Sequence, residues 1–248
     1  MNGLEITLLA LIACLIGLSK GGMGALLVLL TTPLLALAFP IKASISMTLP
    51  LLLIADGFAL AAFWKKWDND YMRELLPASV VGVVLGSIVL ILLPDLTLRR
   101  LMGLFTLAFV VYRLLQPRIA RLAYTPRPWH GPFVGWLSGF GSALANTGSP
   151  PYTAYMLLRK VKPVPFAGTA TLFFAIVNAL KMPGLILGGI FDWQLFLSTL
   201  WAVPLIPIFV YAGRYLVVRI NPVTFDRLML ALLIVASYVL LFVTPTPR

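Results

Sequence analysis

The sequence predicts an all-α polytopic membrane protein made of two inverted repeats of four to five elements, each opening with a broken or re-entrant helix pair. Three observations support this prediction: an apolar composition, long apolar runs between short polar clusters, and matching residues in the two halves of the chain. The 248 residues are 60% hydrophobic and 11% charged, whereas soluble domains are about 45–50% apolar and about 25% charged. This composition excludes a water-soluble globular protein.

Ten apolar runs follow one another along the chain, and the longer ones can cross a hydrocarbon core of about 30 Å. They cover residues 4–18, 22–39, 43–64, 75–93, 101–115, 132–145, 150–158, 166–190, 195–218 and 223–243. At about 1.5 Å per residue the first run spans only about 22 Å. We therefore expect it to enter the membrane and stop. The acidic Glu5 lies where a signal peptide would be basic, so the first run is expected to be retained.

Two pairs of runs are split by short polar stretches, at residues 19–21 and 146–149, and these pairs open the two halves of the chain. When the sequence is shifted on itself by roughly 118 to 128 residues, Gly21 falls on Gly139 and Asp70 on Asp192. Such matches predict an internal duplication, which is common in secondary transporters.

The predicted organisation is a first transmembrane repeat at 1–116, a cytoplasmic linker at 117–131 and a second transmembrane repeat at 132–248.

The net charge of +11 comes from Lys and Arg in the gaps between apolar runs, where they meet anionic lipid headgroups. We interpret the charge as membrane orientation and expect no nucleic-acid partner. With Lys20 and Lys181 set aside, a topology in which each split pair returns to its own side places thirteen cations on one side and four on the other. By the positive-inside rule, both chain ends are then outside.

The glycine-rich stretch from Gly17 to Gly24 is expected to end one helix and to start another near Gly22. The second break has Ser149 as its expected N-cap, followed by Pro150 at the first helical position. The N–H groups and positive dipole end of each new helix favour an anion. The alternative is that these glycines only permit close helix packing.

Three ionisable residues lie inside apolar runs, where an unpaired charge is costly, so each is a candidate functional residue. Lys20 either supplies charge to a substrate or extends to the headgroups. Asp56 and Lys181 occupy corresponding places in the two halves and form either a structural ion pair or a proton-coupling pair, with Asn178 nearby. The predicted substrate-binding residues are Ser19, Lys20, Gly21, Gly22, Gly24, Asn146, Thr147, Gly148, Ser149, Asn178 and Lys181, and the predicted coupling residue is Asp56.

The remaining features point to no catalysis, cofactor or metal site. Cys14 is a single cysteine within an apolar run, and His130 is a single histidine in the polar connector. Gly82 and Gly86 form a small-residue face that favours helix packing.

The motif Gly17-Leu-Ser-Lys-Gly-Gly-Met-Gly with Pro33, and its echo Gly135-Trp-Leu-Ser-Gly-Phe-Gly with Pro150-Pro151, resemble the paired signature of the TauE/SafE sulfite exporter family. The resemblance covers nearly the whole chain. It implies a multi-pass permease of the cell inner membrane that exports small sulfur oxyanions or organosulfonates such as sulfite and sulfoacetate.

The predicted function is secondary transport of a small anion, bound near the membrane midplane and coupled to protons through Asp56. The predicted partners are this anion and the lipid bilayer; the oligomeric state is open, with a homodimer as one alternative. Two other functions stay open: an intramembrane enzyme, which would have to rely on Asp56, Lys181 and Lys20, and an assembly subunit without transport activity.

Overall fold

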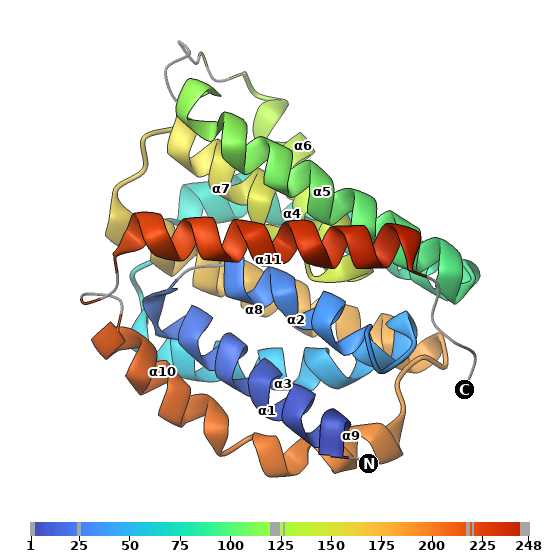
Figure 1. Ribbon diagram of the computed structural model, residues 1–248. Helices are drawn as coiled ribbons and strands as arrows, with labels where there is room; N and C mark the ends of the chain where they lie inside the picture. Colours follow the sequence, from blue (N-terminus) through green and yellow to red (C-terminus); the bar gives the residue numbers. More distant parts are fainter. Residues whose placement is uncertain are drawn as a thin grey trace. The chain divides into compact units, whose positions relative to one another are not determined.

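The computed structural model describes residues 3–23, 26–119, 125, 127–216, 219 and 221–243. These residues form helices and their connections, with no strand among them (Figure 1). The elements in chain order are α1 (Gly3–Leu18), the π-helix η1 (Ser19–Met23), α2 (Leu26–Leu35), α3 (Ile41–Ala62), α4 (Asn69–Leu92), α5 (Asp95–Ile119), α6 (His130–Ala145), α7 (Ser149–Leu158), α8 (Pro163–Leu187), α9 (Trp193–Thr199), the 3₁₀ turn η2 (Leu200–Ala202), α10 (Leu205–Leu216) and α11 (Pro222–Phe242). The predicted all-α class is confirmed.

Five helices in the described part of the chain are long and apolar enough to cross a membrane. They are α1 continued through η1, α3, α4, α8 and the segment Thr224–Phe242 of α11. The pair Trp193–Ala202 and Leu205–Gly213 is also long and apolar enough when taken together, but it is bent by 52°, as in a broken span or a re-entrant loop. This set of apolar helices is that of a polytopic membrane protein.

The expected break after the first run is present, because Gly22 in η1 has non-helical backbone angles. With η1 included, this first segment is 21 residues long, which is long enough to cross a membrane. The run 195–218 is not one element, because the chain bends between η2 and α10. Pro204 lies at this bend, and a proline has no N–H to continue the helical hydrogen bonds.

The helices pack into two compact units, which are described separately. Unit 1 contains Met1–Ala55, Leu93–Val110 and Gly189–Arg248, and unit 2 contains Asp56–Leu92 and Val111–Gly188. Each unit combines segments that are distant in the sequence. The division at 1–116, 117–131 and 132–248 stays a prediction.

In unit 1, α1 and η1 pack closely against α10. A Cβ atom on Gly21 would lie 2.4 Å from the Val210 carbonyl oxygen, and one on Gly17 would lie 2.8 Å from that of Ile206. Arg99 of α5 is buried and donates from Nη1 to the Ala36 carbonyl oxygen at 2.6 Å. This cation satisfies a carbonyl just beyond the C-terminal end of α2, where positive charge is favourable.

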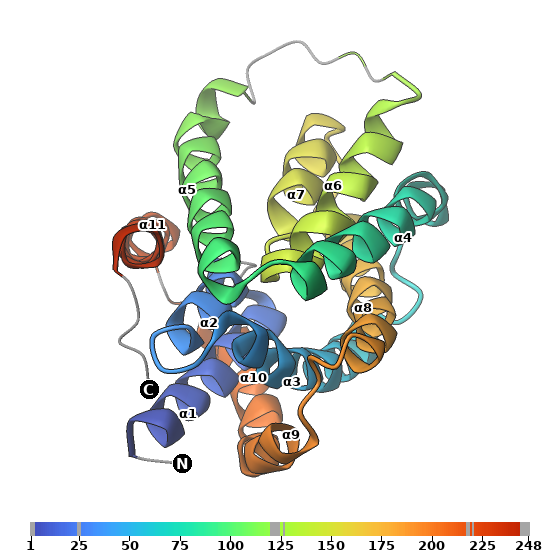
Figure 2. The ribbon, with the colours of Figure 1, turned by 90° about the vertical axis from the view of Figure 1, so that its right-hand side faces the viewer.

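In unit 2, α4 and α6 pack at backbone contact, and α7 and α8 lie beside α6 (Figure 2). A Cβ on Gly135 would lie 2.1 Å from the Leu75 carbonyl oxygen, and one on Gly139 would lie 2.2 Å from that of Ser79. On the facing helix, a Cβ on Gly82 would lie 2.1 Å from the Trp136 carbonyl oxygen. The predicted packing role of the small residues on α4 is confirmed.

Candidate functional site

The first break lies in unit 1, where η1 follows α1. Gly22 has φ 113° and ψ −4°, a conformation that L side chains rarely adopt. The predicted interruption is therefore present, and the next helix, α2, is described from Leu26 onward. The predicted site residue Gly24 lies outside the described residues.

Ser19 and Lys20 lie within the π-turn η1, and both side chains are half-buried. Each already makes a polar contact or electrostatic interaction within the protein. Gly21 is buried against α10, so its missing side chain serves close packing. The role of Lys20 toward a substrate stays a prediction.

The second break lies in unit 2, between α6 and α7. Asn146 ends α6 in the left-handed region at φ 54° and ψ 26°, a conformation that asparagine tolerates better than most residues. Thr147 then donates twice to the Gly141 carbonyl oxygen, from its N–H at 3.1 Å and from its Oγ1 at 3.0 Å. These bonds fix the chain where it reverses into α7.

The expectation that Ser149 caps α7 is wrong. The N-cap is Gly148, which has no side chain to cap the helix, and Ser149 is the first helical residue. A Cβ at position 148 would lie 2.2 Å from the Ser138 carbonyl oxygen of α6, which leaves no room for a capping side chain.

The N-terminal end of α7 has few donors, because Pro150 and Pro151 lack N–H groups. The N–H groups of Gly148 and Ser149 remain, and neither donates to another backbone group among the residues that the structure describes. Two N–H groups at the positive end of a ten-residue helix can bind oxygen atoms of an anion.

Lys181 is 0% exposed in the membrane-spanning helix α8. Its Nζ donates to the Asn146 Oδ1 at 2.7 Å and to the Ser142 carbonyl oxygen and Oγ at 3.2 Å each. Ser142 belongs to the last turn of α6, so the ammonium lies at the negative end of that helix. Lys181 thus connects α8 to the break.

Asp56 and Asn178 form a second polar pair, in which Asn178 Nδ2 donates to Asp56 Oδ2 at 2.6 Å. Both side chains are buried, and Asn178 lies three residues before Lys181 on α8. Residues three apart share one face of a helix. The structure therefore brings Asp56, Asn178, Lys181 and Asn146 together in unit 2; the predicted ion pair between Asp56 and Lys181 stays a prediction.

The sequence model of the family described as sulfite exporter TauE/SafE matches residues 9–240. The chain belongs to the TauE/SafE family. This is a family of membrane transporters, and the match covers both breaks. No curated protein and no solved structure shows a significant match to the chain.

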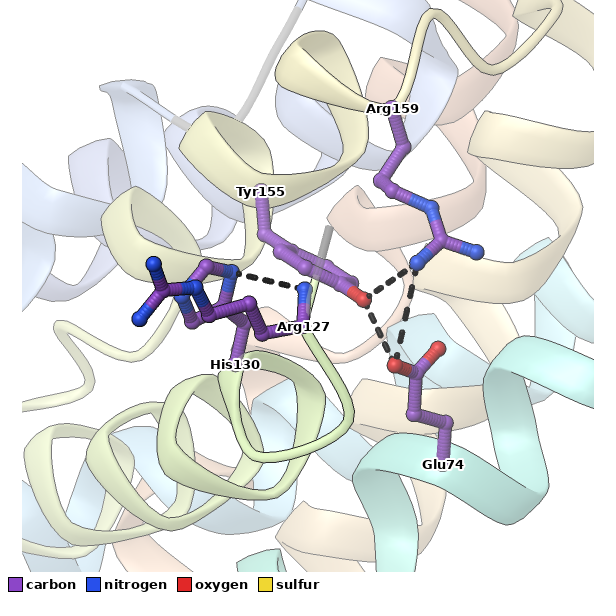
Figure 3. A network of polar contacts seen from close by, with 5 residues as sticks. All are labelled: Glu74, Arg127, His130, Tyr155 and Arg159. Atoms are coloured by element: carbon purple, nitrogen blue, oxygen red, sulfur yellow. Dashed lines mark hydrogen bonds and ion pairs between the residues drawn. The ribbon is translucent and has the colours of Figure 1, made fainter. Parts of the chain in front are cut away.

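In this TauE/SafE protein the structure also shows a polar cluster that sequence analysis missed. Tyr155 and Arg159 at the C-terminal end of α7 meet Glu74 of α4 (Figure 3). Burial alone lowers the pKa of Arg159, but a hydrogen bond with Tyr71 and the proximity of Tyr155 and Glu74 outweigh it and leave that pKa above its usual value. The spacing of Tyr155 and Arg159, four residues on one helix, is the only sequence signal.

Ser142 was also missed as a partner of Lys181. Its carbonyl and hydroxyl oxygens become ligands only because α8 packs against the end of α6, which a sequence pattern does not reveal. Within the described residues, no group of three or more His, Cys, Asp or Glu side chains could hold a metal ion.

Proposed function

We propose that this TauE/SafE protein exports a small sulfur oxyanion, sulfite or an organosulfonate such as sulfoacetate, across a cell inner membrane. In this proposal the anion binds at the break between α6 and α7, beside Lys181. Family membership supports membrane transport, and the second break supports an anionic substrate.

The observation that carries the proposal is the position of Lys181. A buried lysine in a membrane helix is costly, so it marks a functional position by default. Its Nζ donates to oxygen atoms of Ser142 and Asn146, and these bonds hold the ammonium at the break. A sulfonate or sulfite at the start of α7 would be attracted to the Lys181 ammonium and would accept hydrogen bonds from the N–H groups of Gly148 and Ser149.

We further propose that Asp56 couples transport to protons. A carboxylate buried in a membrane protein is a common proton carrier, and Asn178 holds this one on the face of α8 that carries Lys181. Asp56→Asn should remove the response of transport to a pH gradient while substrate binding persists. Gradient-driven transport at the original rate in Asp56→Asn would assign Asp56 a structural role.

The duplicated architecture is part of the proposal. Gly21 and Gly139, which the shifted sequences align, both pack onto a carbonyl oxygen of a neighbouring helix. This equal role supports an internal repeat, and we infer that the two halves are inverted relative to each other.

The substrate is tested with a panel in proteoliposomes: sulfite, sulfoacetate, sulfate, phosphate and a dicarboxylate, each with and without a proton gradient. Lys181→Met should weaken binding of the transported anion by at least about tenfold, because one charge-assisted hydrogen bond contributes roughly 1.5–3 kcal/mol. Calorimetry on folded, monodisperse protein measures this affinity.

The matched control is Lys162→Met, which removes the same charge from an exposed position at the start of α8. It should leave the affinity unchanged. Equal affinity in Lys181→Met and the unmodified protein would show that the anion binds elsewhere.

A further inference from the structure

We propose that Glu74, Tyr155 and Arg159 are positioning residues for α7: they hold its C-terminal end so that its N-terminal end stays in place at the α6–α7 break. We call these three residues the α7 clamp. The assignment of the break as a substrate site rests on the proposed function. The role of the three residues in holding α7 is independent of it.

The clamp is a set of charge-assisted contacts. The Tyr155 hydroxyl donates to Glu74 Oε1 at 2.6 Å, and Arg159 Nη1 donates to the Tyr155 hydroxyl at 3.0 Å (Figure 3). Arg159 Nη1 lies 3.9 Å from Glu74 Oε1, and both side chains are about three-quarters buried, at 27% and 24% exposed. Burial at this level makes such contacts stronger than those on an open surface.

The acidic member of the clamp is held by a third helix. A Cβ on Gly131, in the first turn of α6, would lie 2.3 Å from Glu74 Oε1. The Glu74 carboxylate therefore packs against the positive N-terminal end of α6. The guanidinium of Arg159 also lies over the Tyr71 ring of α4, 5.2 Å from its centroid. The clamp thus joins α7 to both α4 and α6.

The clamp acts on the break through the stiffness of a short helix. The ten residues of α7 extend about 15 Å, with the break at one end and Arg159 at the other. Tyr155 lies six residues after Ser149, or about 9 Å along the axis. A helix of this length moves as one body, so releasing one end tilts the other.

The second tether of α7 is at the break itself, where Lys181 holds Asn146 and Thr147 bonds to Gly141. Between the two ends, the buried Tyr152 donates from its hydroxyl to the Phe166 carbonyl oxygen of α8 at 3.2 Å. When the clamp is released, the C-terminal end of α7 can tilt about these remaining contacts. The orientation of the Gly148 and Ser149 N–H groups then depends on residues that never touch the anion.

The experiment measures the break without any substrate. In a Cys14→Ala background, Ser149→Cys provides a single thiol at the half-buried start of α7, and its maleimide labelling rate reports the position of that end. Tyr155→Phe removes only one hydroxyl from a buried ring and should change the labelling rate about tenfold, as expected for loss of a hydrogen bond to a charged group. Glu74→Gln keeps an acceptor for Tyr155 and should have a smaller effect.

Gly131→Ala is the independent variant, because its methyl group displaces the Glu74 carboxylate without removing a polar atom. The matched control is Asp70→Asn, which breaks the exposed Arg73–Asp70 pair, also 3.9 Å apart, on the same helix α4. It should leave the rate unchanged. In protein that retains native Cys14 and Ser149, Tyr155→Phe should leave Cys14 labelling unchanged, since general loosening would alter both thiols.

An unchanged labelling rate at position 149 in both folded Tyr155→Phe and Gly131→Ala would overturn the clamp. Parallel changes at Cys14 and position 149 would also overturn it, because they indicate general destabilisation. Loss of the proposed function appears in a different measurement, the affinity for sulfite and sulfoacetate, so the two proposals fail separately.

Discussion

At the scale of single residues, the geometry of the second break depends on the absence of a side chain at Gly148. Its position against Ser138 excludes a side chain, and the neighbouring prolines exclude N–H groups. The residues at the start of α7 therefore allow close packing against α6. They leave only two N–H groups, those of Gly148 and Ser149, at this end of the helix.

Substitutions at Gly148 and Ser149 should have very different effects on stability. Gly148→Ala should lower the free energy of unfolding by about 1–3 kcal/mol, because its methyl group overlaps a backbone oxygen that cannot move freely. Ser149→Ala should cost less than about 0.5 kcal/mol, since no capping bond is lost. Thermal unfolding in detergent compares the two variants; a larger loss for Ser149→Ala would mean that its hydroxyl does cap the helix.

Lys20 at the first break is tested in the same way as Lys181. If its ammonium contributes to anion binding, Lys20→Met should lower the affinity at least about tenfold, and Lys20→Arg should lower it less. Calorimetry with singly and doubly charged anions adds a second criterion, because a charge effect grows with the charge of the anion. An unchanged affinity would show that the lysine reaches the headgroups instead.

Sequence analysis found Asp56 and Lys181, and also Asn178 and Asn146, but it missed Ser142 as a partner of Lys181 and missed the cluster around Tyr155. A charged residue inside an apolar run stands out in the sequence even when its partners are unknown. Nothing in the sequence around Ser142 or Tyr155 distinguishes these residues. Ser142 contacts Lys181 because of how α6 packs on α8, and Tyr155 contacts Glu74 because of how α7 packs on α4.

At the scale of elements, glycine decides how close the helices come. The α4–α6 pair is in backbone contact at Gly139, whereas Gly57 of α3 has open space where a Cβ would lie. These two helical glycines form a matched pair for experiment.

Gly139→Ala should destabilise the protein by about 1–3 kcal/mol, because its methyl group would lie 2.2 Å from the Ser79 carbonyl oxygen. Gly57→Ala should be neutral or stabilising by up to about 1 kcal/mol, because alanine favours helix and meets no neighbour. Melting temperatures of the two variants in one detergent give the comparison. Equal shifts would contradict a packing role for Gly139.

Hydropathy predicted where most helices lie, because every apolar run within lipid must satisfy its own backbone hydrogen bonds and therefore forms a helix. It missed the bend before α10, because the residues around Pro204 are apolar on both sides and the run does not stop. It also placed the end of the first helical segment at residue 18, whereas that segment extends through Ser19 and Lys20 to the kink at Gly22.

At the scale of the whole molecule, the distribution of Lys and Arg predicts the orientation in the membrane. A cysteine introduced at Asp95 should react with a membrane-impermeant reagent added outside, and one at Lys66 only after permeabilisation. Asn2 and Arg248, expected outside, and Arg121, expected inside, lie outside the described residues. Labelling of position 66 or 121 from outside would refute this orientation.

The packing of α1 on α10 has a consequence for biosynthesis. Gly17 and Gly21 find their neighbours only after Leu205 and the rest of α10 have been made. At about 5–20 residues per second, synthesis from Leu18 to Leu205 takes roughly ten to forty seconds. During this interval the first helix presents its glycine face to lipid or to other proteins, so a chain interrupted before α10 leaves the ribosome with that face still uncovered.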